Sequence, residues 1–438
     1  MRANNTEVSD PGKKHFIFAS LCLLVILFAM TLNDLPVQEM LGTLGASPIW
    51  AVSAIIFVFF LIHNRFSLYL DKYSRFFMFY FLLTFCISLI QCVWYYISEG
   101  TILNSYGVSV FSKHIFASSY YLFYFLAIYC ASYALRSVPG NIFKKTVILI
   151  AFFLVFIIAI EYVAPETLAP FHLSMDGYGI GSRLRLLSPE PSIAAFTFNI
   201  FLLMAITLSN VNLIRLVLWG ALLVGNLLIG SKSSLLLIMF GGLLVFYFNM
   251  SLIQKIKSLV VLIPVMGVVI YIFLYTVLPA LTVDIENFSS VSTRMTTSLW
   301  AVCSLFYYPL GEGYGTYTVW FVDPLETATS LANSLVPFPL NLIEINDMVD
   351  TGNYLSAKSG ILFSVVHSGF MAVVFYFIIF RNAFRDVQKS NVDYYQKILL
   401  RVTLWYSLLS ILLAVNMEVL YAFLLPFIVV GHLKNQNQ

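Results

Sequence analysis

The chain has 438 residues, of which 60% are hydrophobic and only 10% are charged, and its net charge is +3. Soluble proteins carry about 25% charged residues, so this composition excludes a soluble domain, a disordered chain and a coiled coil. The small net charge gives no sign of a nucleic-acid partner, and the five cysteines show neither metal-ligand spacing nor a CxxC motif. The sequence therefore predicts an all-α protein that crosses a membrane many times.

Apolar runs of about 20 residues, the length that crosses a bilayer, recur along the chain. The polar start resembles that of a signal peptide, but no small-residue cleavage site follows, so the first run is kept as a span. The last run, 398–433, is interrupted by Asn416 and Glu418 and is interpreted as two short helices. We expect about twelve transmembrane helices, at 15–33, 44–62, 76–97, 115–135, 146–164, 189–208, 213–230, 233–250, 258–279, 361–380, 398–414 and 419–433.

Positive residues are distributed unevenly between the two predicted sides. With the N-terminus in the cytoplasm, 18 of the 24 Lys and Arg residues lie on the cytoplasmic side, and 16 of the 21 Asp and Glu residues lie on the other side. Cytoplasmic connections of membrane proteins carry such a positive excess, so we expect both termini in the cytoplasm. The outer cations are Lys113, Arg183, Arg185, Lys232, Arg294 and Lys358.

One outer connection, residues 280–358, is far longer than the usual link between two helices, and such long loops are usually functional. Apolar residues at helical spacing predict a helix over residues 289–307 within it. The expected organisation is residues 1–279, with nine spans and the outer loop 165–188; residues 280–358, the large and partly helical loop; and residues 359–438, with three spans.

Three charged residues lie before or at the start of the span predicted at 189–208. Arg183 and Arg185 stand in an unusually apolar segment. Because the guanidinium fork matches phosphate oxygens bidentately, the pair is a candidate phosphate clamp, and anchoring to lipid headgroups is the alternative. Glu190 lies between two prolines, where it is either a carboxylate favoured by the helix dipole or a general base and ion partner.

Two further outer cations are candidate anion ligands. Lys232 is the only charge in a hairpin between two apolar spans. It is either a positive tip at the headgroups or a second phosphate contact, assisted by the hydroxyl of Ser231 and its neighbours. Arg294 begins the predicted loop helix and is either a solvated arginine on a polar face or a group that stabilises a leaving pyrophosphate.

The segment 311–315 is rich in glycine but lacks both a preceding strand and the GK[ST] signature of a nucleotide-binding loop. Gly313 and Gly315 predict either a turn after a helix or a close backbone approach to a substrate. His367 lies inside a predicted span, where it is a functional candidate or a neutral histidine hydrogen-bonded between helices. Asp284 and Glu286 are the nearest approach to a metal pair and match weakly, so we expect no metal and no cofactor.

Four segments in this order resemble the Wzy-type polysaccharide polymerases and the related O-antigen ligases, which share a C-type glycosyltransferase fold. The segments are Arg183–Ala194 with its Glu-Pro-Ser, Gly230–Ser234, Ser292–Gly315 with its arginine helix and glycines, and Ser359–Gly369. The chain departs from the family where Lys232 replaces a common arginine. Ligases also have a histidine at the start of the span after the large loop, where this chain has Lys358 or Ser359, and this difference favours a polymerase.

The resemblance implies an inverting glycosyltransferase that polymerises undecaprenyl-pyrophosphate-linked repeat units at the periplasmic face of the bacterial inner membrane. It implies that Arg183, Arg185 and Arg294 bind the diphosphates, that Lys232 assists, and that Glu190 is a base or orients the acceptor. The implied partners are lipid-linked oligosaccharides, the bilayer and a chain-length regulator protein. An O-antigen ligase and a flippase, which would need binding residues along the span interiors, remain the alternatives.

Overall fold

The computed structural model describes residues 11–63, 68, 70–173, 183–249, 289–336, 340–352, 355–415 and 420–435. In these residues the regular backbone is helical, and the one β-bridge, between Leu103 and Ser109, is isolated. Six of the described helices are long and apolar enough to cross a membrane, which is consistent with an all-α membrane protein. They are α4 (Lys72–Glu99), α5 (Val110–Ser137), α6 (Gly140–Val163), α7 (Pro191–Leu208), α8 (Asn212–Ile229) and α18 (Tyr394–Leu413).

The predicted number of twelve spans is not confirmed. Beside the six long helices, the described residues contain shorter apolar helices, and the predicted span 258–279 lies outside them. The shorter helices are α1 (Pro11–Ala29), α3 (Ile49–His63), α9 (Lys232–Asn249) and α19 (Leu425–Asn435), the last preceded by the 3₁₀ turn η4 (Tyr421–Leu424). A further 3₁₀ turn, η2 (Pro165–Phe171), follows α6.

The expectation of one continuous span at 361–380 is wrong. The chain forms α16 (Gly360–Ser368), breaks at Gly369, and continues as α17 (Phe370–Lys389). Gly369 has a φ of 57°, and a Cβ atom at this position would collide with the carbonyl oxygen of Pro309. A loop from a distant part of the sequence therefore packs against the break, which hydropathy alone does not reveal.

Helix α7 is the central helix of the bundle and is buried along its whole length apart from its first two residues. Its sequence is almost entirely apolar, and its buried amide is hydrogen-bonded. Asn199 Nδ2 donates to Asn226 Oδ1 at 3.0 Å on α8, to Ser234 Oγ at 2.7 Å on α9 and to Tyr406 OH at 3.1 Å on α18. Because lipid offers no hydrogen-bond partners, such interhelical bonds hold membrane helices together.

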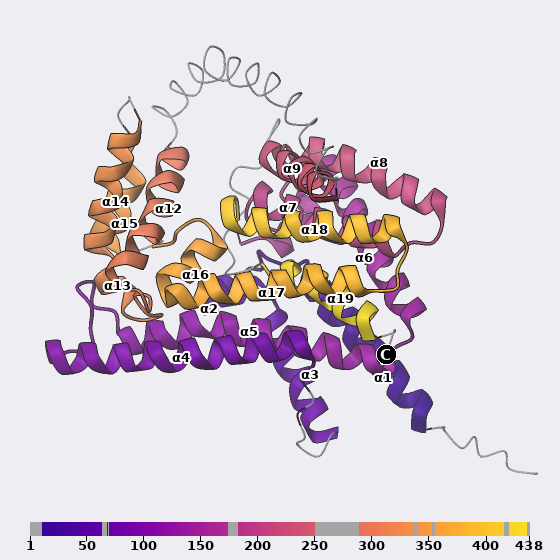
Figure 1. The fold of residues 1–438 in the computed structure, drawn as a ribbon, viewed down its shortest axis with the longest axis horizontal. Helices are drawn as coiled ribbons and strands as arrows, with labels where there is room; N and C mark the ends of the chain where they lie inside the picture. Colours follow the sequence, from indigo (N-terminus) through magenta and orange to yellow (C-terminus); the bar gives the residue numbers. More distant parts are fainter. Residues whose placement is uncertain are drawn as a thin grey trace, which may run out of the picture.

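The described part of the predicted large loop forms a helical unit at one end of the bundle (Figure 1). The unit comprises α12 (Ser289–Tyr307), α13 (Tyr317–Trp320), α14 (Val322–Leu335) and α15 (Ile343–Thr351). Helix α12 confirms the helix predicted at 289–307. The unit has its own apolar core around Trp300, Phe321 and Met348, which continues into α16 through Phe363 and Val366. This shared core joins the unit to the bundle.

Three residues from the predicted cytoplasmic side lie together at the other end of α17. Lys72 Nζ lies 2.8 Å from one carboxylate oxygen of Asp386, and Lys434 Nζ lies 3.6 Å from the other. Helices α4, α17 and α19 thus bring three predicted cytoplasmic ends into contact. Which side of a membrane this end faces stays a prediction.

Candidate functional site

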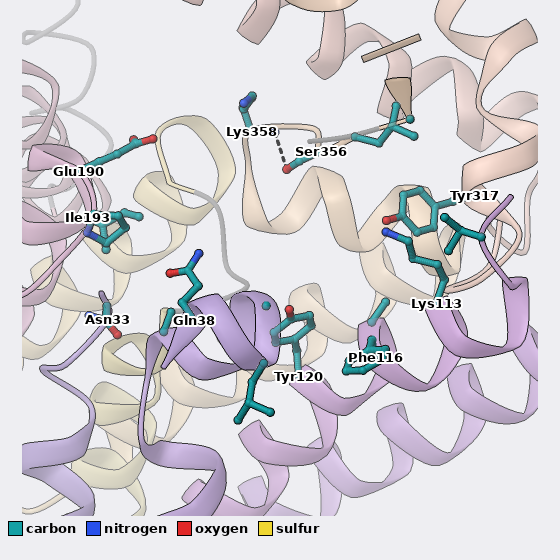
Figure 2. A pocket seen from close by; sticks show the side chains of 18 of the residues that line it. Asn33, Gln38, Lys113, Phe116, Tyr120, Glu190, Ile193, Tyr317, Ser356 and Lys358 are labelled. Carbon is teal, nitrogen blue, oxygen red and sulfur yellow. Dashed lines mark hydrogen bonds between the residues drawn. The ribbon is translucent and has the colours of Figure 1, made fainter. Parts of the chain in front are cut away.

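A cavity of about 670 Å³ lies where the α12–α15 unit meets the bundle, and its volume is that of a typical ligand site (Figure 2). Its walls come from residues 33–46, which include α2 (Gln38–Leu41) and η1 (Gly42–Ala46), from the starts of α5, α7 and α12, and from the segment before α16 that includes Ser356 and Lys358. The charged residues that line it are Lys113, Glu190, Arg294 and Lys358. All four lie in segments that the sequence predicts on the outer side.

Glu190 occupies the N-cap position of α7 but forms no side-chain hydrogen bond to the helix backbone. Its extended backbone is followed by Pro191, and its Oε2 accepts a hydrogen bond of 3.2 Å from Ser192 Oγ. The side chain is exposed and extends toward the open space of the cavity (Figure 2). The geometry therefore offers a carboxylate to a ligand rather than to the helix.

Arg294 enters the cavity from α12 and is half-buried. Its Nη1 donates a hydrogen bond of 2.9 Å to the carbonyl oxygen of Ala414, at the C-terminal end of α18. Carbonyl groups at a helix C-terminus carry partial negative charge, so this bond orients the guanidinium. Arg294 thus lies at a junction of two helices and not on a solvated helix face.

The sequence predicts Lys358 only as an outer cation, yet this lysine lines the cavity beside α15. Its Nζ lies 2.9 Å from Glu344 Oε1, and Thr293 Oγ1 donates to Glu344 Oε2 at 2.8 Å. Burial of Glu344 acts to raise its pKa, but the hydrogen bonds from Lys358 and Thr293 together hold it below the ordinary value. An ionised Glu344 therefore fixes the lysine and the beginning of α12 on the same wall.

Arg183 does not line the cavity but lies against the hairpin that follows α8. A Cβ atom on Gly230 would lie only 2.9 Å from Arg183 Cδ, so two of the four segments that carry the family resemblance are in contact. Ser231 in this hairpin is buried. Lys232 begins α9, and its side chain lies outside the described residues.

Arg185 is also outside the cavity. Its backbone N–H and that of Leu186 donate to the two carboxylate oxygens of Glu161, each at 2.7 Å, and its Nη1 lies 3.5 Å from the Pro189 carbonyl oxygen. Of the three predicted arginines, Arg294 is the one that lines the cavity. The predicted contacts of Arg183 and Arg185 with a diphosphate stay predictions.

Gly313 and Gly315 belong to the glycine loop, which is defined here as residues 308–316, and neither lines the cavity. Gly313 has a φ of 83°, and a Cβ atom there would lie 2.5 Å from Gln91 Oε1 on α4. A Cβ atom on Gly315 would collide with the carbonyl oxygen of Val110, at the start of α5. Both glycines therefore permit close packing of protein on protein.

His367 lies behind one wall of the cavity. Its ring centroid is 5.0 Å from that of Tyr317, which lines the cavity, and 4.2 Å from that of Phe363. The His367 side chain is buried, and neither ring nitrogen has a hydrogen-bond partner among the described residues. Its carbonyl oxygen accepts the N–H of Gly313 at 3.1 Å, which ties α16 to the glycine loop.

The described part of the chain offers no cluster of side chains with the composition of a metal site. No group of three His, Cys, Asp or Glu side chains there could hold a metal ion. The weak candidate pair, Asp284 and Glu286, lies outside the described residues.

Comparison with known proteins identifies a relative of this all-α membrane protein. No protein-family model matches the chain. A protein described as an "uncharacterized 49.5 kDa protein in cps region" of Klebsiella pneumoniae is 28% identical over 264 residues. The match covers 59% of this chain and 59% of the relative, so the chain spans about three fifths of that protein's length.

Proposed function

We propose that this protein acts in polysaccharide biosynthesis and that it polymerises oligosaccharide repeat units linked to undecaprenyl pyrophosphate. The relative from a cps region, a capsule-polysaccharide region, supports the general role. The six long apolar helices support a membrane setting, which a lipid-linked substrate needs. The proposed location is the bacterial inner membrane, with both termini in the cytoplasm and the cavity on the periplasmic side.

The observation that carries the proposal is the charge arrangement of the cavity. Arg294 and Lys358 supply positive charge on one wall, and Glu190 supplies an exposed carboxylate. Preorganised cations stabilise the negative charge that develops on a leaving diphosphate. A carboxylate within reach of a sugar hydroxyl can accept its proton as the hydroxyl attacks. The two roles require oppositely charged groups in one space, and the cavity offers both.

In the proposed reaction, the hydroxyl oxygen of an incoming repeat unit attacks the anomeric carbon of the growing glycan. The bond from that carbon to the diphosphate oxygen breaks, and the configuration inverts. The hydroxyl proton passes to Glu190, while undecaprenyl pyrophosphate leaves beside Arg294 and Lys358. Arg183, Arg185, Ser231 and Lys232 would contact lipid-linked substrates outside this cavity, and a chain-length regulator protein would be a further partner.

Deletion of the gene tests the proposed polymerase directly. The strain should display single repeat units and no long chains at its surface, because the unit is still made, flipped and transferred. Surface glycans are separated by gel electrophoresis, and the lipid-linked pool is extracted in parallel. Complementation with the wild-type gene should restore long chains, and an expressed Glu190→Gln variant should not.

The same experiment separates the two alternatives. Long polymer retained on undecaprenyl pyrophosphate would contradict polymerisation and indicate a ligase. Lipid-linked single units confined to the cytoplasmic side would indicate a flippase. Normal long chains in the deletion strain would contradict all three activities.

A further inference from the structure

The three cations of the cavity differ in what holds them. Arg294 donates to the Ala414 carbonyl oxygen at 2.9 Å, and Lys358 pairs with Glu344 at 2.9 Å. Lys113, in contrast, has no side-chain hydrogen bond or ion pair with any residue that the structure describes. Arg294 and Lys358 are therefore held in position by protein groups beside the cavity, whereas Lys113 has no such partner among the described residues.

The position of Lys113 is not explained by the stability of its own helix. It lies in the first turn of α5, and that turn contains no acidic residue. A helix N-terminus carries partial positive charge, which disfavours a lysine there. An anion in the cavity would offset this unfavourable charge.

Lys113 and Glu190 lie on different sides of the open space in the view of Figure 2, with Lys113 on the α5 wall. Glu190 is the one carboxylate among the residues that line the cavity, and it comes from the start of α7. The α5 wall therefore has positive charge without a carboxylate beside it.

The rest of the α5 wall is suited to a sugar. Phe116 and Tyr120 follow Lys113 on the same face of the helix, at the spacing that aligns side chains along α5. Ser112 on α5 and Gln38 on α2 add uncharged hydrogen-bonding groups to the lining of the cavity. A glycan that lies along this wall would place an anionic group next to Lys113.

We propose that Lys113 forms a second anion-binding subsite of the cavity, separate from the wall of Arg294 and Lys358. It binds a second anionic group of the substrates, which is either the diphosphate of the acceptor lipid or the carboxylate of an acidic sugar. The substrate class rests on the proposed function, whereas the presence of two anion subsites does not.

The test measures anion binding to the purified full-length protein in detergent. Labelled pyrophosphate and labelled glucuronate are the two probes, and equilibrium dialysis gives affinity and stoichiometry. The variants are Lys113→Gln, Lys113→Arg and Arg294→Gln, with Lys389→Gln, in the last turn of α17, as the matched control. Size-exclusion profiles and melting temperatures confirm that each variant is folded.

Loss of a charged contact should weaken one class of sites about tenfold in Lys113→Gln, and Lys113→Arg should retain most of the affinity. A loss in pyrophosphate binding identifies the acceptor diphosphate, and a loss in glucuronate binding identifies a sugar carboxylate; either supports the subsite. Arg294→Gln should weaken pyrophosphate binding at the other class of sites.

Wild-type binding of both probes by Lys113→Gln would overturn the proposal, and so would an equal loss in Lys389→Gln. An equal loss in Lys113→Arg would also overturn it, because the charge would then not be the determinant. These outcomes are distinct from failure of the proposed polymerase, since a ligase phenotype in the deletion strain leaves the binding data unchanged.

Discussion

Tyr317 lines the cavity and directly follows the glycine loop in the chain, yet the polar groups of the two regions differ in exposure and in charge. In the cavity, Glu190 is exposed and Arg294 is half-buried. In the glycine loop, Glu312 is fully buried, and its Oε1 accepts a hydrogen bond of 3.1 Å from Trp300 Nε1. The cavity thus exposes charged side chains that a ligand can contact in place of water. The polar groups of the glycine loop are instead used to hold helices together.

Two carboxylates show the electrostatic side of this difference. Hydrogen bonds from Lys358 and Thr293 outweigh burial and lower the pKa of Glu344, which stabilises its charge beside the cavity. Burial raises the pKa of Glu312 to about 8, so this side chain is a neutral acid at pH 7. The comparison teaches that a conspicuous motif such as the glycine loop can serve packing, while binding depends on separate residues from several helices.

The largest effect is expected at Arg294. Removal of one group that stabilises transition-state charge costs about 10²–10³-fold in rate, so Arg294→Ala should lose nearly all polymer synthesis. Arg294→Lys should fail almost as badly, because it loses the bidentate fork. Polymer length on gels, normalised to protein in the membrane, measures the effect. Normal polymer from a stably expressed Arg294→Ala protein would break the assignment of the cavity as the reacting region.

A smaller effect, on stability and not on chemistry, is expected at Gly315. An added methyl group would collide with the Val110 carbonyl oxygen, and overpacking of this kind costs about 1–3 kcal/mol. Gly315→Ala should therefore lower the melting temperature and the amount of folded protein. Gly242→Ala, on α9, is the control, since a Cβ atom there meets nothing within 4 Å. A fully stable Gly315→Ala protein that no longer makes polymer would instead favour a substrate role for the loop.

Local sequence predicted much of the fold because hydropathy and helical spacing act over a few turns. The helix at 289–307 is found as α12, and long apolar runs became α4 to α8 and α18. The break at Gly369 could not be predicted in this way. It depends on the Pro309 carbonyl oxygen, which comes from a segment far away in the chain.

The candidate site was predictable only in part for the same reason. The motifs around Glu190 and Arg294 indicate a functional role for both residues, and both line the cavity. Lys113 and Lys358 have no motif, and their one signal was membership of the small group of outer cations. Their common location follows from packing of α5 and of the segment before α16 around one space, and no local pattern encodes that contact.

The smallest effect at acidic pH is expected for Glu312→Gln, which sharpens the comparison by removing the ability of the buried loop carboxyl to ionise while preserving its shape. The acceptor of the Trp300 hydrogen bond is retained in the amide.

The pKa of Glu312 is raised from 4.5 to about 8 in the folded protein, so the native state keeps a proton that the unfolded chain releases. Stability from this group is therefore complete below the unfolded pKa, falls as the pH rises between the two values, and levels off above the folded pKa. Because glutamine does not ionise, the Glu312→Gln variant should not lose stability in this way as the pH rises. Its melting temperature, compared with that of the wild type from about pH 5 to about pH 9, should rise relative to the wild type by a few degrees toward pH 8. Other titrating groups are shared by the two proteins and cancel in the difference. A difference that does not change with pH would show that Glu312 is already ionised in the folded protein, and the contrast between a charged cavity and a neutral glycine loop would then fail.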